Sequence, residues 1–263
     1  MIIDTHLHVF PDNLAEKAIT KLSNSSHLTP FTNGTISDTL SKMDKYNIDK
    51  AVCLNIAVKP NQDKKVNDFA IKNNSDRLIM FGSINPYSDN IENELKRLVD
   101  NGIKGIKLHP LYQGFKVDDP ICDKLYSLCE KLGIRIAFHA GFDSAYPFKN
   151  NASPKRLRKV LLKYKNLKVQ LAHLGGMMKW RAVYHNLCGL NCYFDLGMVA
   201  GYIKPKQALK IFNKHGIDKI MFATDCPWNN FEKTLNFLDS LGLSKENREK
   251  ILYKNALKFL DME

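Results

Sequence analysis

The first ten residues, MIIDTHLHVF (residues 1–10), are the stretch from which the fold of this chain can be worked out. The run is apolar enough for a buried strand, yet it carries His6 and His8 near its end. Side chains alternate across a strand, so these two imidazoles project to the same side, roughly 7 Å apart at their Cα atoms. Asp4 is expected on that side too. Polar groups on a buried face need partners, so this strand either binds a ligand or faces solvent.

The rest of the chain alternates short apolar segments with longer amphipathic ones. The longer stretches have apolar residues at helical spacing, and several end in a glycine that is typical of a helix C-terminus. Strictly alternating strands and helices predict a parallel sheet, and eight strands predict a closed (β/α)₈ TIM barrel. The expected strands are residues 1–9, 51–57, 78–84, 103–110, 134–141, 167–176, 192–197 and 219–228.

Most strand starts are separated by about 30 residues, the length of a β-plus-α unit. The first interval is longer, which indicates an insertion at about residues 10–48 that is placed to act as a lid over the barrel mouth. No linker or low-complexity segment divides the chain, so residues 1–263 are expected to form a single barrel domain. A doubly wound open sheet is the alternative, but the glycine-rich phosphate motif that often accompanies it is absent.

The composition is that of an ordinary globular protein, with 44% hydrophobic and 25% charged residues. No apolar run approaches the roughly 20 residues of a membrane-spanning helix. Polar residues interrupt the N-terminal stretch where a signal peptide would be apolar, so a cytoplasmic location is expected. The six cysteines form no CxxC pair and are expected to be reduced thiols, mostly buried.

A net charge of +12 raises the question of a nucleic-acid partner. The densest basic run, residues 154–168, has apolar side chains at helical spacing, which leaves its charges on the outer face of a helix. Lysine also far outnumbers arginine along the chain. The pattern is typical of a solvated helix face, so we expect neither a nucleic-acid partner nor membrane association.

Five of the eight histidines stand in the last residues of expected strands, and Asp225 has the same place on the eighth strand. In a (β/α)₈ barrel these positions meet at the C-terminal mouth, where active sites of this fold are built. Imidazole and carboxylate ligands suit Zn²⁺, Mn²⁺ and Fe²⁺. A closed structural zinc site is the alternative, but such sites favour cysteine-rich ligand sets. The five histidines are His6, His8, His109, His139 and His173.

Four short motifs carry a resemblance to a known family: DTHLH (4–8), FHAG (138–141), AHLGG (172–176) and ATDCPW (223–228). In this order and on these strands, they resemble the amidohydrolase superfamily. More narrowly, they resemble the amidohydrolase-related branch that includes aminocarboxymuconate-semialdehyde decarboxylase and related small hydrolases. The resemblance spans the whole chain and implies a metal-dependent TIM-barrel enzyme.

The resemblance implies one divalent metal ion, usually Zn²⁺ and alternatively Mn²⁺ or Fe²⁺, bound by side chains of strands one, five and eight. It implies that His173 acts beside the metal as a general base or as a contact to the transition state. Asp225 can share that catalytic role, because a carboxylate at the metal can accept a proton from water. Asp4 is expected either to orient a ligand histidine or to make a strand-end hydrogen bond. The implied ligands are His6, His8, His139 and Asp225.

Strand four carries Lys107 and His109, which face the barrel interior if their apolar neighbours face outward. Two-metal members of the superfamily have a carboxylated lysine on this strand, and Lys107 occupies a matching place. Mononuclear relatives lack that modification, so we expect an unmodified Lys107, or His109, to face the substrate. An ion pair of Lys107 with Asp4 or Asp195 is the structural alternative.

Residues just beyond the strand ends are candidates for contacts to a substrate. Phe142 and Trp228 are expected in the pocket wall, and Arg181 is placed to clamp a substrate carboxylate. The alternative puts Arg181 on the surface of the helix that follows strand six. Further candidates for the pocket wall are Phe10, Tyr112 and Met198.

These features indicate a metal-dependent hydrolase that acts on an amide, a lactone or a similar electrophilic carbon of a small molecule. Non-oxidative decarboxylation of an unsaturated or aromatic acid is the alternative. A TatD-like deoxyribonuclease shares the barrel and the HxH motif, but the bridging glutamate of that pattern is missing here. A non-catalytic ligand-binding barrel is disfavoured by the complete ligand set. Relatives often pair as dimers, so a homodimer is a further expectation.

Overall fold

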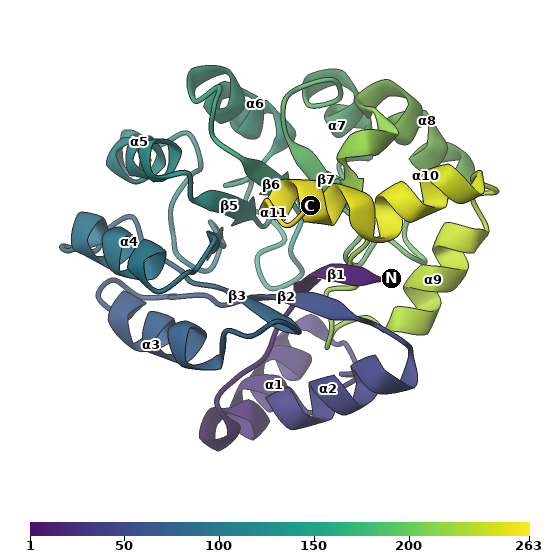
Figure 1. Ribbon diagram of the computed structural model, residues 1–263. Coiled ribbons are helices and arrows are strands. Elements are labelled where there is room, and N and C mark those ends of the chain that lie inside the picture. The colour runs from purple at the N-terminus through teal and green to yellow at the C-terminus, as the bar shows by residue number, and fades with distance from the viewer.

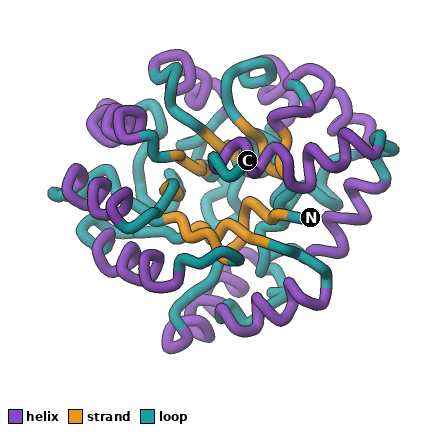
Figure 2. The backbone as a smooth tube through the Cα atoms, in the orientation of Figure 1, coloured by secondary structure: helices purple, strands orange, loops and turns teal.

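The computed structural model describes residues 1–263 and contains eight strands at the eight places expected from the sequence. All paired strands are parallel. Helices surround the ring of strands, so the chain forms a (β/α)₈ barrel (Figure 1, Figure 2). The strands are β1 (Ile3–Leu7), β2 (Lys50–Leu54), β3 (Leu78–Phe81), β4 (Gly105–Leu108), β5 (Arg135–Phe138), β6 (Val169–Leu171), β7 (Tyr193–Asp195) and β8 (Ile220–Met221).

Short bridges close the barrel between its three-stranded part, β1–β2–β3, and its five-stranded part, β4 to β8. At the β8–β1 seam, Asp225 donates its backbone N–H to the carbonyl oxygen of His6 at 2.7 Å. His8 donates in turn to the carbonyl oxygen of Cys226, also at 2.7 Å. This seam fixes the end of β1 beside the segment after β8, which brings two distant sequence motifs together.

The helices bury one face and expose the other, as their apolar spacing predicts. Helix α6 (Pro154–Lys163) buries Leu157, Val160 and Leu161, which confirms that the basic run there is the outer face of a helix. None of the helices combines the length and the apolar character that crossing a membrane requires. The other helices are α1 (Asp12–Ser26), α2 (Ile36–Lys45), α3 (Asp63–Asn73), α4 (Ile91–Asp100), α5 (Asp123–Leu132), α7 (Trp180–Asn186), α8 (Pro205–His215), α9 (Phe231–Asp239), α10 (Lys245–Glu249) and α11 (Asn255–Leu260).

The C-terminal helix α11 covers the end of the barrel opposite the mouth, and in Figure 1 it lies across the ring of strands. Its residues Phe259 and Leu260 pack with Ile3 of β1 and Met221 of β8 in one apolar cluster. A larger cluster of 58 buried residues fills the space between the strands and the outer helices. All six cysteines are free thiols and five of them are buried. Helix α11 therefore closes one end of the barrel, and the C-terminal mouth is its open end.

Strand β1 is irregular, and the irregularity changes the side on which Asp4 lies. The pairing with β2 shifts by one residue between Asp4 and Leu7, which is a β-bulge. Asp4 accepts hydrogen bonds from the backbone N–H groups of His6 at 2.9 Å and Thr224 at 3.1 Å, and from the Thr224 hydroxyl. The expectation that Asp4 shares the inward face of His6 is wrong, because the bulge interrupts the alternation. Asp4 instead makes the strand-end hydrogen bonds that were its alternative role.

The segment between β1 and β2 folds as helix α1, a loop and helix α2. The side chain of Thr35 caps α2 by accepting the backbone N–H of Asp38. Leu14 and Leu22 of α1 line the cavity at the barrel mouth. The role of this insertion as a lid stays a prediction.

Candidate metal centre

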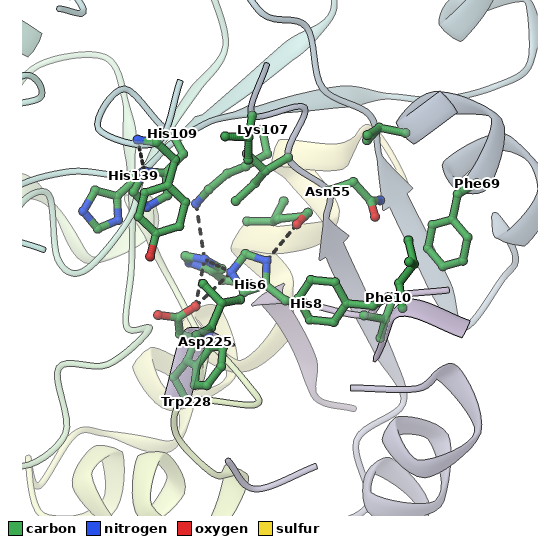
Figure 3. A pocket seen from close by; sticks show the side chains of 18 of the residues that line it. His6, His8, Phe10, Asn55, Phe69, Lys107, His109, His139, Asp225 and Trp228 are labelled. Carbon is green, nitrogen blue, oxygen red and sulfur yellow. Dashed lines mark hydrogen bonds and ion pairs between the residues drawn. The ribbon is translucent and has the colours of Figure 1, made fainter. Parts of the chain in front are cut away.

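Two histidines and an aspartate converge at the C-terminal mouth of the barrel (Figure 3). Nε2 of His6 lies 3.3 Å from Nε2 of His8 and 3.2 Å from Oδ1 of Asp225. Nε2 of His8 lies 3.1 Å from the same carboxylate oxygen. These three residues are here called the β1–β8 trio. Three potential ligand atoms this close together are an arrangement that a single cation can satisfy.

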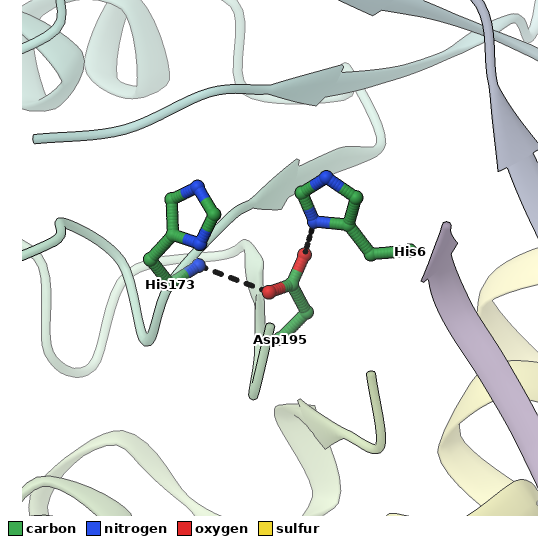
Figure 4. A group of neighbouring side chains, drawn as sticks. All are labelled: His6, His173 and Asp195. Atoms are coloured by element: carbon green, nitrogen blue, oxygen red, sulfur yellow. Dashed lines mark hydrogen bonds and ion pairs between the residues drawn. The ribbon is translucent and has the colours of Figure 1, made fainter. Parts of the chain in front are cut away.

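In both histidines the outer ring nitrogen, Nδ1, points away from Asp225 and donates a hydrogen bond to an oxygen acceptor. Nδ1 of His6 donates to Oδ2 of Asp195 at 3.0 Å (Figure 4), and Nδ1 of His8 donates to the carbonyl oxygen of Leu54 at 2.8 Å. A carbonyl or carboxylate oxygen only accepts, so each imidazole carries a proton on Nδ1 and directs Nε2 toward Asp225. Two imidazole lone pairs and a carboxylate oxygen repel one another unless a positive charge lies between them. This donor set fits a divalent cation.

Asp195, at the end of β7, is a buried carboxylate that supports the trio. Its Oδ2 also accepts from Nε2 of Gln170 at 2.7 Å, and its Oδ1 accepts the backbone N–H groups of His173 at 2.9 Å and Gly197 at 3.0 Å. Burial opposes its ionisation, but the nearby His6 and the hydrogen bonds outweigh burial and hold the pKa of Asp195 below its usual range. The carboxylate therefore orients His6 and anchors the end of β6.

From the sequence, Asp195 is expected only as an alternative partner of Lys107. The signal that identifies it is its place, because it ends a strand just as the site histidines do. Gly197 follows, and a Cβ atom there would lie 3.2 Å from Oδ1 of Asp195, from Nδ1 of His6 and from Cβ of Asp225. Glycine at this position lets the backbone approach the trio closely.

Burial and charge set the protonation states of the trio at neutral pH. Burial and the neighbouring Lys107 lower the pKa of His6 to about 4, so its imidazole is neutral. Burial opposes ionisation of Asp225, but the nearby histidines outweigh burial and hold the pKa of this carboxyl well below its usual range. A neutral imidazole and an ionised carboxylate are the forms that bind metal ions.

Lys107 is fully buried on β4 and directs its ammonium group toward the trio. Its Nζ lies 3.3 Å from Nε2 of His6, to which it donates. Burial lowers the pKa of Lys107 to about 8, so the ammonium form still predominates at neutral pH. No carboxylate lies within ion-pair distance of Nζ, so the alternative pairing with Asp4 or Asp195 does not form.

A second group of two histidines and an aspartate lies beside the first and is here called the β4–β5 trio: His109, His139 and Asp143. The two imidazole rings are stacked with centroids 4.1 Å apart. Nε2 of His109 lies 3.4 Å from Oδ2 of Asp143, and Nε2 of His139 lies 4.0 Å from it. Nε2 of His139 is buried without a hydrogen-bond partner. The structure thus groups His139 with His109 and Asp143, whereas the family resemblance implies a place beside His6, His8 and Asp225.

His173, at the end of β6, connects the two trios. Its Nδ1 donates to the carbonyl oxygen of Gly197 at 2.9 Å, and its Nε2 lies 3.1 Å from Nδ1 of His139. The ring centroids of His173 and His6 are 5.4 Å apart. Since Nδ1 carries a proton, Nε2 has the lone pair that a general base needs, and here it accepts the Nδ1–H of His139, which leaves Nε2 of His139 without a proton.

The backbone is unusual at Asp225 and His173, whose φ angles of 68° and 60° lie in the left-handed region. Residues other than glycine rarely occupy this region, and those that do cluster at functional sites. Hydrogen bonds hold both residues there. Asp225 donates its backbone N–H to His6, and His173 donates its own to Asp195.

The two trios open into a cavity with two lobes. The first lobe has a volume of about 450 Å³ and extends toward α1 and α3, and the second has about 300 Å³ and extends toward the loops after β5, β6 and β7. His139, His173 and Asp225 line both lobes. Sites that hold small molecules typically measure about 300–1,000 Å³. The lobes therefore meet at the reactive side chains and have the size of a small-molecule site.

Most of the predicted substrate contacts line this cavity. Trp228 lines both lobes, Lys107 and His109 line the first, and Phe142 lines the second. Arg181 is exposed on α7 and lines a separate basic depression between α7 and α8. It does not line the cavity, and it lies on the surface of the helix after β6, as the alternative expectation has it.

The sequence does not point to the wall that β2 and α3 contribute. Asn55 and Val58 follow β2, and Val66 and Phe69 lie on α3, yet all four line the first lobe. No motif marks them, because their side chains come from a loop and a helix rather than from the end of a histidine-bearing strand. Helix α3 is amphipathic, as is any outer helix that packs against the barrel, so its sequence does not indicate a contact with the cavity.

Comparison with known proteins agrees with the architecture. The chain resembles 5-carboxyvanillate decarboxylase LigW from Sphingomonas paucimobilis, with a TM-score of 0.75 at 13% identity over 100% of this chain and 99% of that chain. It resembles the probable 2-pyrone-4,6-dicarboxylic acid hydrolase of Acinetobacter baumannii, with a TM-score of 0.70 at 20% identity over 99% of each chain. A 5-carboxyvanillate decarboxylase from Novosphingobium aromaticivorans, solved with bound manganese, has a TM-score of 0.73 at 14% identity over 99% and 97% of the two chains.

These structural likenesses show the fold that the chain shares with TIM-barrel proteins. Among curated protein sequences, none matches the chain. The amidohydrolase family model, however, matches residues 3–262, which is nearly the entire sequence. The chain belongs to the amidohydrolase family.

Proposed function

We propose that this protein is a metal-dependent hydrolase of a small organic molecule, with the metal held by His6, His8 and Asp225. The observation that carries the proposal is the approach of their ligand atoms to within 3.3 Å of one another while both outer nitrogens are fixed. A divalent cation there would lower the pKa of a water molecule and polarise a substrate carbonyl. Zinc suits the ligand set, and manganese, bound in one structural relative, is the alternative. His139 remains a predicted fourth ligand.

The residues around the trio have distinct roles in this proposal. His173 accepts a proton from the attacking water at Nε2 and returns it to the leaving group. Lys107 supplies a positive charge where negative charge develops on a substrate oxygen. The amine of Lys107 already donates to Nε2 of His6 at 3.3 Å, and we predict an unmodified lysine and a single metal ion.

The two-lobed cavity favours hydrolysis over decarboxylation. An ester or amide has a carbon framework on both sides of the bond that breaks, and the two lobes give space on both sides of His173 and Asp225. Decarboxylation releases only CO₂ on one side of the broken bond. A second large lobe would then have no occupant.

Decarboxylation of an aromatic acid is the second candidate function. It is supported by the buried cation Lys107, which can pair with a substrate carboxylate, and by the named activities of two of the structural relatives. In that reaction the same cavity would position an acidic group to protonate the ring carbon that loses CO₂.

A metal-supplemented assay separates the two candidates. The purified protein is loaded with Zn²⁺ or Mn²⁺ and offered esters and lactones while acid release is titrated, amides while the released amine is measured, and aromatic carboxylic acids while CO₂ is measured. We expect metal-dependent acid release. Release of CO₂ without hydrolysis would establish the alternative, and the absence of both reactions at full metal content would contradict the enzyme proposal.

A further inference from the structure

The first lobe of the cavity is walled by apolar side chains from elements outside the strand-end motifs. They come from the insertion after β1, which begins at Phe10 and includes helix α1, and from the segment that runs from the end of β2 through α3. In Figure 3, Phe10 and Phe69 lie on the side of His8 that faces away from His139. The wall includes Phe10, Leu14, Leu54, Val58, Val66 and Phe69, and the part of the cavity that these residues line is here called the α1–α3 lobe.

Several apolar side chains around the cavity are exposed to water. Leu14 and Val58, from two different elements of the α1–α3 lobe, are 41% and 42% exposed. Met178 and Tyr202 on the second lobe are 53% and 43% exposed. Four of the ten large hydrophobic side chains that are exposed anywhere in the structure therefore line one cavity. Such concentrated apolar surface next to reactive groups is characteristic of a ligand site.

The α1–α3 lobe offers little to a polar ligand. Its only charged side chain away from the histidines, Lys107 and the aspartates is Lys65, which is exposed. The amide of Asn55 already donates to the carbonyl oxygen of Phe81 at 2.8 Å, and Oε1 of Gln62 already accepts the backbone N–H of Lys59 at 3.0 Å. A polar group in this lobe would lose hydration and find few partners, chiefly Oδ1 of Asn55, Nε2 of Gln62 and the ammonium group of Lys65.

We propose that the α1–α3 lobe binds an extended apolar group of the substrate, an alkyl or arylalkyl chain attached to the carbon that reacts at the histidines. The proposal rests on the proposed function only for the position of that reacting carbon. Burial of the chain covers Leu14 and Val58, so the hydrophobic effect supplies the binding free energy. The second lobe then remains for the leaving group.

Equilibrium binding tests the lobe without relying on turnover. The protein as purified is titrated by calorimetry with straight-chain carboxylates from butanoate to decanoate, whose carboxylate end pairs with the ammonium group of Lys107. The dissociation constant is expected to fall by up to about fourfold for each added methylene, which corresponds to about 0.8 kcal/mol per buried CH₂. A dissociation constant that does not change with chain length would overturn the proposal.

Matched variants locate the chain within the cavity. Leu14→Asp and Val58→Asp place a charge on the α1–α3 lobe at exposed positions, so folding should be unaffected, and each should reduce the gain per methylene to below about twofold. Met178→Asp places the same charge at an exposed position of the second lobe and should leave the gain unchanged. Melting temperatures of the three variants check that they fold. If only Met178→Asp reduces the gain, the chain lies in the second lobe and the proposal is wrong.

The same experiments keep this proposal separate from the proposed hydrolase function. An intact chain-length dependence in a protein that hydrolyses no ester, amide or lactone would overturn the hydrolase proposal and leave the lobe in place. Metal-dependent hydrolysis without any chain-length dependence in binding or in kcat/KM would overturn the lobe proposal alone.

Discussion

The two trios contain the same residue types, yet only in the β1–β8 trio do both histidines present a ring lone pair to the carboxylate. In the β1–β8 trio, the outer nitrogens of both histidines donate to fixed oxygens, which leaves both Nε2 atoms as acceptors. In the β4–β5 trio, Nδ1 of His109 accepts the backbone N–H of Tyr112 at 3.4 Å. The proton of His109 therefore lies on Nε2 and points to Asp143, where a ligand would have to offer a lone pair.

Burial does not distinguish the trios. It lowers the pKa of His6 to about 4 and the pKa values of His109 and His139 well below the usual range, so these imidazoles are all neutral at pH 7. What differs is the position of the proton on one ring, that of His109. The hydrogen bonds around a buried histidine, more than a nearby carboxylate, thus decide whether it can act as a ligand.

Removal of the β1–β8 histidines is expected to have the largest effect. The double variant His6→Ala, His8→Ala should lose the single metal ion that we expect per chain, because only Asp225 of the trio remains. Elemental analysis of the protein after dialysis against metal-free buffer measures this loss.

The matched control removes the same residue types from the other trio. His109→Ala together with Asp143→Ala should retain the metal. If the control loses the metal and the first variant keeps it, the metal belongs to the β4–β5 trio and the comparison is reversed.

The histidine between the trios should matter for turnover and little for the metal. His173→Ala is expected to lower kcat by about 10²–10⁴-fold, the usual contribution of a general base, at near-normal metal content and melting temperature. Steady-state kinetics and elemental analysis of the same preparation check both statements. A metal-free variant would make His173 a ligand, and full activity would remove it from the mechanism.

A buried histidine outside both trios isolates the effect of burial. Nε2 of His215 donates to the carbonyl oxygen of Cys192 at 2.9 Å, and its ring stacks on Phe194. Burial lowers the pKa of His215 to about 4, so between about pH 6.5 and pH 4 the unfolded chain binds a proton that the folded chain does not. The free energy of unfolding should therefore fall as the pH falls through this window, by up to about 3 kcal/mol from this residue.

Denaturant titrations at several pH values between 7 and 4 compare the unaltered protein with His215→Gln. The glutamine variant should lose less stability on acidification, because its side chain does not titrate. Asp4 acts in the opposite direction, because burial raises its pKa to about 7 and the folded chain holds the extra proton. That contribution is common to both proteins and cancels in the difference. Equal losses of stability in the two proteins would contradict the role given to His215.

The positions of the strands and of the site at the barrel mouth could be predicted from the sequence. Each site motif marks the end of a strand, and the barrel brings those ends together. Three features of the structure could not be predicted from the sequence. The bulge in β1 moves Asp4 off the inward face, although simple alternation puts it there. Asp195 supports His6 across 189 positions of sequence, a contact that no local pattern encodes. Phe69 reaches the cavity from a helix that looks like any other outer helix of the barrel.

The smallest effects are expected from substitutions at two carboxylates, Asp195 and Asp143. Asp195 contacts His6 of the β1–β8 trio, and Asp143 belongs to the β4–β5 trio. Asp195→Asn should lower the affinity for the metal by about 10–100-fold, the usual effect of changing a residue that orients a ligand. An asparagine NH₂ group facing Nδ1 of His6 would need an acceptor there. The imidazole proton would then move to Nε2, and His6 would no longer offer its lone pair to the trio.

Competition with a chelator of known affinity measures this change, and Asp143→Asn is the matched control. It alters the same residue type in the β4–β5 trio and should leave the affinity within about twofold, because Asp143 contacts neither His6 nor His8. The Asp195→Asn protein should still bind metal when enough is supplied, since His8 and Asp225 keep their geometry. If the two variants lose metal affinity equally, the residues around each trio do not determine which trio binds the metal. His6 would then be held by the fold around β1 rather than by the carboxylate of β7.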